Sequence, residues 1–290
     1  MNTKEKRLGT KAQIRAIKNR ERHIATVIFL VFILLIVIFS SYFTYNFLNQ
    51  PQNQTTNPAS NPESPQPKAA IVDQLSLTFP NQTFMQTATN TLKQAGYTVD
   101  YYPGEKVTVE FYRNLPTHDY KLIILRVHSA LSPYESYVSL FTSEPYDKTR
   151  YTYEQLTDRL FIGSYSEEDR KKGIFYFGIP PAFVKNSMNG KFDNTSIIMM
   201  GCNGLTYDCL AKAFIEKRAK VYISWSDSIS ASHTDTGTTQ LLKHLITEKQ
   251  TIEQAVENTM KEVGPDPAYN SLLIYYPVEA GEQTIENIKR

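Results

Sequence analysis

Two residue types that together can do covalent chemistry each follow a buried apolar run. His128 comes directly after the run 120–127, and Cys202 follows the run 196–200 and Gly201, 74 positions further along. A cysteine thiol becomes a useful nucleophile when an adjacent base or positive group favours the thiolate. If the two runs are neighbouring strands of one parallel sheet, the imidazole and the thiol leave it at the same edge. The sequence therefore predicts a His128/Cys202 dyad.

The elements around Cys202 form a strand, a helix and a second strand. The apolar run 196–200 is too short for a helix and indicates a strand. Over 205–215 the apolar residues recur at near-helical spacing, and basic residues follow them, which indicates a helix. The apolar run 221–225 indicates the second strand. Parallel strands joined in this way bind ligands at their carboxyl ends. Other expected elements are strands over 69–77, 98–102 and 271–276, a hairpin over 137–143 and 160–164, and helices over 83–95, 238–248 and 251–263, while 107–115 is open between strand and short helix.

This alternation predicts an α/β domain over 69–290, with a mostly parallel sheet covered by helices on both faces. Thr251 and Gln254 have the spacing of a capping box at the start of the last helix. His233 and Asp235 fall in a polar stretch, 228–239, which we expect to be a loop that either borders the site edge or is merely exposed.

The strings LIILRVHS at His128 and SIIMMGCNG at Cys202, followed by Trp225-Ser-Asp227, resemble the caspase-like cysteine peptidases, which include caspases, gingipains and CHAT domains. The resemblance covers roughly residues 69–278. It implies the caspase-haemoglobinase fold, with Cys202 attacking the scissile carbonyl and His128 assisting proton transfer. Many members of that family have glycine after the histidine, where this chain has Ser129, which still offers a backbone N–H.

The resemblance also assigns roles around the dyad. It implies that the backbone N–H groups of Ser129 and Cys202 bind the oxyanion, and that Ser224, Trp225 and Asp227 line the substrate pocket. Asp227 there would favour a basic side chain before the scissile bond. The plain alternative for Asp227 is a carboxylate that caps the loop or the following helix.

The amino-terminal part predicts where the domain resides. Residues 1–23 carry eight Lys or Arg against two Glu, and 24–48 hold no charged residue and are long enough to span a bilayer. This charge bias predicts a cytoplasmic tail, a single-pass transmembrane helix and an extracytoplasmic domain at the cell membrane. A cleaved signal peptide is the rival interpretation. Residues 49–68 contain five prolines and predict a semi-extended spacer.

Charge and motif content exclude several functional classes. The net charge of +2 arises from the tail, so the pI gives no support to nucleic-acid binding, and no pair of residues has metal-ligand spacing. We expect a peptide or protein substrate, no cofactor and no metal. An alternative for the two cysteines is a Cys202–Cys209 disulfide. An alternative for the domain is a catalytically inactive binding or cell-surface module. A hydrolase or sensor of envelope polymers is a third, weaker possibility.

Overall fold

A computed structural model describes residue 33 and residues 66–285 of the 290-residue chain. The predicted basic tail, the apolar segment 24–48 apart from residue 33, and the spacer up to residue 65 lie outside the described residues. Within the described part of the chain, no helix combines the length and the apolar character that a bilayer crossing requires.

The centre of the domain is a six-stranded sheet that is parallel except at one edge. Its strand order is β10-β9-β8-β3-β1-β2, and only β10 runs antiparallel to its neighbour. The strands are β1 (Lys68–Asp73), β2 (Thr98–Pro103), β3 (Tyr120–Arg126), β8 (Ser196–Met199), β9 (Val221–Trp225) and β10 (Leu273–Tyr276). β3 and β8, the strands that lead to His128 and Cys202, pair directly, with Leu122 opposite Ser196 and Leu125 opposite Met199.

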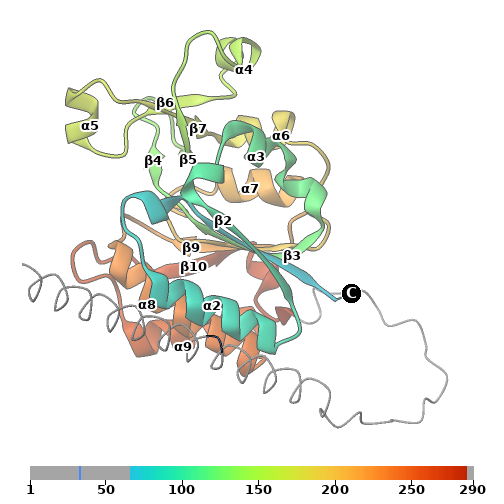
Figure 1. Ribbon diagram of the computed structural model, residues 1–290. Coiled ribbons are helices and arrows are strands. Elements are labelled where there is room, and N and C mark those ends of the chain that lie inside the picture. The colour runs from blue at the N-terminus through green and yellow to red at the C-terminus, as the bar shows by residue number, and fades with distance from the viewer. Residues whose placement is uncertain (1–32, 34–65, 286–290) are drawn as a thin grey trace, which may run out of the picture. The chain divides into compact units, whose positions relative to one another are not determined.

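Helices cover both faces of this sheet, as Figure 1 shows. One face packs against α2 (Gln82–Gln94), α8 (Ala231–Leu242) and α9 (Ile252–Val263), and the other against α3 (Val109–Asn114), α6 (Pro181–Ser187) and α7 (Cys209–Glu216). Alternate residues of the central strands enter the two cores, which is why β3 and β8 are apolar at almost every position. The predicted α/β class with a mostly parallel sheet is confirmed.

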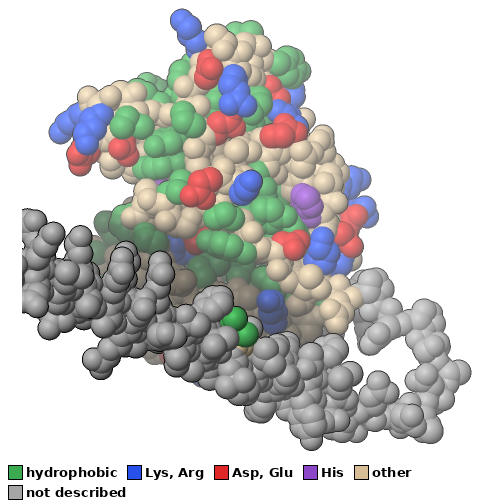
Figure 2. Space-filling view, in the orientation of Figure 1, with side chains coloured by type: hydrophobic (Ala, Val, Ile, Leu, Met, Phe, Trp, Pro, Cys, Tyr) green, Lys and Arg blue, Asp and Glu red, His purple; other side chains and the backbone are tan. Residues whose placement is uncertain are grey.

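A second, antiparallel sheet is inserted between β3 and β8. It has the order β4-β5-β7-β6, with β4 (Ser129–Leu131), β5 (Val138–Pro145), β6 (Phe161–Gly163) and β7 (Tyr176–Ile179). The short helices α4 (Thr152–Leu156) and α5 (Glu167–Lys171) lie beside it at the top of Figure 1. On the face in Figure 2, Lys and Arg side chains lie among Asp and Glu side chains and form no continuous basic patch there.

Three sequence-based expectations about local structure are wrong. The segments 137–143 and 160–164, expected to form a hairpin, contain β5 and β6, which each pair with β7 and not with one another. The stretch 228–239, expected to be a polar loop, contains the first nine residues of α8, and a π-helical turn, Lys243–Thr247, continues that helix. Only part of its polar residues face solvent, because Thr234, Asp235 and Thr238 are buried. The first strand ends at Asp73 rather than residue 77, and a 3-10 turn, η1 (Gln74–Leu77), follows it.

Other local predictions are confirmed. Thr251 and Gln254 form both hydrogen bonds of a capping box at the start of α9. The open alternative at 107–115 resolves as helix α3, whose first turn is capped by the Thr108 side chain.

Candidate active site

The segments after β3 and β8 are held in direct contact. Ser129 Oγ donates a hydrogen bond to the Cys202 carbonyl over 2.5 Å, and the Met200 N–H donates to the Leu125 carbonyl over 2.9 Å. A Cβ added to Gly201 would collide with the carbonyl oxygen of Val127. Gly201 is therefore the residue that lets the cysteine loop approach the histidine segment this closely.

Four contacts fix the position of His128. Its backbone N–H donates to Gln74 Oε1 over 2.8 Å, and its ring Nε2 lies 2.9 Å from Thr78 Oγ1. The ring stacks on Tyr165 with centroids 4.8 Å apart, and the edge of Phe79 lies against it at 5.9 Å. Nδ1 has no hydrogen-bond partner in the described part of the chain. Burial lowers the pKa of His128 to about 4, so the imidazole is neutral near pH 7.

Cys202 is a partly buried, protonated thiol. Its Sγ donates to the Ile229 carbonyl over 3.6 Å, and among the described residues no hydrogen bond joins it to the His128 ring. Burial raises the pKa of this thiol, and the carboxylates of Asp266 and Asp227 raise it further. The resting pair is thus a neutral thiol and a neutral imidazole, rather than a thiolate and an imidazolium.

Both side chains open on one cavity of about 430 Å³ at the carboxyl end of the parallel sheet. Its wall is completed by η1 and Phe79, by Tyr165 of the inserted region, and by the first turn of α8. A volume of this size is in the range of small-ligand sites. The sequence-predicted residues His128 and Cys202 are therefore brought together.

The two backbone N–H groups expected to bind an oxyanion donate to no other residue in the range 66–285. The Phe141 N–H donates to the His128 carbonyl over 2.8 Å, so position 128 faces β5 with its carbonyl, just before the first pair of the β4–β5 ladder, while the His128 N–H donates to Gln74. In an antiparallel ladder the next pair, Ser129 and Leu140, is then non-hydrogen-bonded, and the Ser129 N–H points away from β5. The Cys202 N–H donates to no other residue among those described.

The three residues expected to form the substrate pocket do not line this cavity. Ser224 and Trp225 are completely buried: Ser224 Oγ donates to the Met199 carbonyl, and Trp225 Nε1 donates to Thr234 Oγ1. Asp227 is exposed, and its carboxylate accepts the Ser228 N–H over 2.6 Å. Ser224 and Trp225 thus contact Met199 and Thr234 in the interior of the protein, and Asp227 binds the backbone of its own loop.

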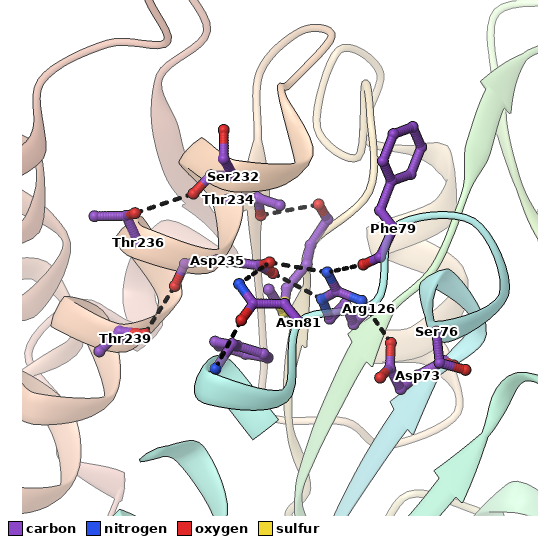
Figure 3. Close-up of polar contacts among 12 residues, drawn as sticks. Asp73, Ser76, Phe79, Asn81, Arg126, Ser232, Thr234, Asp235, Thr236 and Thr239 are labelled. Carbon is purple, nitrogen blue, oxygen red and sulfur yellow. Dashed lines mark hydrogen bonds and ion pairs between the residues drawn. The ribbon is translucent and has the colours of Figure 1, made fainter. Parts of the chain in front are cut away.

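A buried ionic cluster beside the dyad escaped the sequence-based reasoning. Arg126 is fully buried and donates to both Asp235 oxygens, over 2.7 and 2.8 Å, to Asp73 over 2.7 Å, and to the Phe79 carbonyl over 2.7 Å. Asn81 caps α2 with one side-chain atom and donates to Asp235 with the other (Figure 3). The cluster ties β1, β3, α8 and the segment 74–81 together, and that segment carries Gln74, Thr78 and Phe79.

The sequence did contain one signal for this cluster. Arg126 interrupts an otherwise apolar buried strand, and a buried guanidinium requires carboxylate or carbonyl partners. Its two carboxylate partners lie 53 and 109 positions away, which no local pattern reveals.

The two cysteines are both free, with Cys209 exposed and its Sγ 3.5 Å from the Ser136 carbonyl. No group of three or more His, Cys, Asp or Glu residues able to hold a metal occurs in residues 66–285. The sequence matches no protein-family model and no curated protein.

Proposed function

We propose that this chain is a cysteine endopeptidase of the caspase-like group, with Cys202 as the nucleophile and His128 as the base. The observation that carries the proposal is that the two side chains follow adjacent parallel strands and border the same 430 Å³ cavity. The order of the elements, with the histidine strand first and the cysteine strand next to it, supports the caspase-haemoglobinase form of the α/β fold.

Thr78 gives the imidazole a defined role. When Nε2–H donates to Thr78 Oγ1, the Nδ1 lone pair is left to accept a proton. A base oriented by a third group is the arrangement that activates nucleophiles. Thr78 is therefore a positioning residue for His128.

The neutral resting pair determines the order of events. Cys202 Sγ attacks the carbonyl carbon of the scissile peptide bond while its proton passes to His128 Nδ1. The N–H groups of Ser129 and Cys202 stabilise the oxygen that gains negative charge. The imidazolium then gives its proton to the leaving amine as the C–N bond breaks, and water hydrolyses the remaining thioester. Proton transfer accompanies attack, since no thiolate exists beforehand.

The same proposal includes location. A domain held outside the cell membrane by the segment 24–48 and the spacer 49–68 would act on peptides or proteins at the outer surface. This is supported by the sequence alone.

An inactive binding module is the second candidate, and two specific observations favour it. The Cys202 thiol hydrogen-bonds the Ile229 carbonyl and not the imidazole, and the pKa of that thiol is raised. In this alternative the cavity binds a peptide that is never cleaved.

The experiment that separates the two uses the full chain and its two cysteines. Cleavage of a peptide library by wild-type protein should fall on the order of 10³-fold or more in Cys202→Ala and at least ~10²-fold in His128→Ala. Cys209→Ala is the matched control and should keep wild-type activity, because this thiol lies outside the cavity. Peptide binding without cleavage by the wild type would favour the inactive module and contradict the peptidase.

A further inference from the structure

The cavity beside the dyad contains no formally charged residue. None of its 13 lining residues is Asp, Glu, Lys or Arg. The apolar part of the wall is made by Leu75, Phe79, Val127, Met200, Ile229 and Ala231. His128 adds no charge near pH 7, because burial lowers its pKa to about 4. A charged group entering this space would lose water and find no counter-ion.

Apart from the dyad and the Tyr269 hydroxyl, the polar side chains of the wall are already hydrogen-bonded within the protein. Thr234 Oγ1 donates to the Met200 carbonyl and accepts from Trp225 Nε1, both at 2.9 Å. The Tyr165 hydroxyl donates to the Thr142 carbonyl over 2.6 Å, and the Ser230 hydroxyl bonds the Asp266 carboxylate. These groups have little left to offer a ligand, so the wall recognises shape and apolar area.

The two carboxylates whose field acts on the Cys202 thiol are held by their own loops. Asp266 accepts backbone N–H groups of Ser230, Ala268 and Tyr269 over 2.8–3.0 Å. Burial alone would raise the pKa of Asp266, but these donors lower it below the ordinary value. The Asp227 carboxylate accepts one N–H group, that of Ser228, and neither carboxylate lines the cavity. They give a basic side chain no direct partner, and their field opposes an acidic one.

We propose that this cavity binds the side chain of the residue whose carbonyl Cys202 attacks, and that it selects an uncharged apolar side chain such as leucine, methionine or phenylalanine. The thiol is itself part of the wall, so the side chain nearest the attacked carbon is the one that enters. The inference rests on the proposed function, and it replaces the expectation of a basic side chain paired with Asp227.

The test is a set of fluorogenic peptides that differ only at the residue before the scissile bond, assayed with the full-length protein. The kcat/KM values for Leu, Met and Phe should exceed those for Arg, Lys, Asp and Glu by at least about 10-fold. Cleavage that prefers Arg, Lys or an acidic residue overturns this inference while leaving the peptidase intact. If no peptide is cleaved, or if Cys202→Ala cleaves the peptides as fast as the wild type, the proposed function is overturned and this inference with it.

A pocket-filling variant tests whether this particular cavity makes the choice. Ala231→Leu should lower kcat/KM for Phe relative to Ala peptides by about 10-fold, because the added side chain occupies the cavity. Ser232→Leu is the matched control on the next, exposed position of α8, and it should leave the ratio unchanged. An equal ratio in wild type and Ala231→Leu would contradict the assignment of the cavity.

Discussion

His128 and Cys202 are both kept uncharged by the same physical cause, which is removal of water from around the charged form. Burial lowers the pKa of the imidazole to about 4 and raises the pKa of the thiol. Each shift favours the neutral species, so the two groups do not stabilise one another as an ion pair. Gln74 accepts the backbone N–H of His128, and Thr78 contacts Nε2 of its ring. Both partners are uncharged and add no counter-charge.

The shifted imidazole predicts a pH dependence of stability. Between pH about 6.5 and about 4 the unfolded chain binds a proton at His128 that the folded chain does not, so the free energy of unfolding falls as pH falls through this window. The upper limit of the effect is about 3 kcal/mol, reduced by partial exposure of the ring. Urea unfolding at pH 7 and pH 4.5 measures it.

The comparison variant for this measurement is His128→Asn, which cannot titrate in that range and should lose less stability on acidification than the wild type. His118→Asn, a change outside the cavity, should behave as the wild type does. Parallel losses in wild type and His128→Asn would show that the ring is not held neutral by the fold.

At the scale of elements, the apolar strands were predictable and the polar helix was not. The mostly apolar composition of runs such as 120–127 and 196–200 indicates that they are buried strands, because both faces of a central parallel strand are buried. Helix α8 has no comparable apolar stripe, since its buried side includes Thr234 and Asp235. Their partners are the Met200 carbonyl and Arg126, which lie far away in the sequence. Helical structure there depends on tertiary contacts that local pattern cannot express.

The Arg126 cluster joins these elements, which leads to a prediction about the loop that carries Thr78. Arg126→Met should lower the free energy of unfolding by about 3–5 kcal/mol, because it leaves the Asp73 and Asp235 carboxylates buried without their cation. Arg126→Lys should cost less, since it keeps the charge but cannot donate to all four acceptors. Urea unfolding gives the values, and peptide cleavage reports the effect on His128.

Arg113→Met provides the matched comparison. This arginine pairs with Glu110 and Glu154, and its side chain is 19% exposed against 0% for Arg126, so water can reach the groups that lose their partner and the loss of stability should be smaller. Restoring part of the lost stability by adding Asp73→Asn and Asp235→Asn to Arg126→Met would identify the unpaired carboxylates as the cause. A cost for Arg126→Met no larger than that for Arg113→Met would refute the role given to the cluster.

At the scale of the whole molecule, the site is assembled from segments that lie more than 100 residues apart in the chain. The cavity is lined by η1, the ends of β3 and β8, the inserted region and the start of α8, so no sequence window could show that its wall lacks charge. The common edge of His128 and Cys202 was predictable, because two strand ends of one parallel sheet meet there. The prediction that Ser224, Trp225 and Asp227 line the pocket was wrong, because these residues lie in β9 and the loop after it, while the cavity lies at the ends of β3 and β8.

The exposed, free Cys209 makes the predicted orientation of the chain measurable. In intact cells producing Cys202→Ala, a membrane-impermeant maleimide should label Cys209 if the domain lies outside, because its thiol is exposed. Cys209→Ser in the same background should remove the label. A cysteine introduced as Thr3→Cys into that cysteine-free variant should react only after permeabilisation, since the basic tail is predicted to be cytoplasmic. Labelling of Cys209 that also requires permeabilisation would place the dyad on the inner side and exclude substrates at the outer surface.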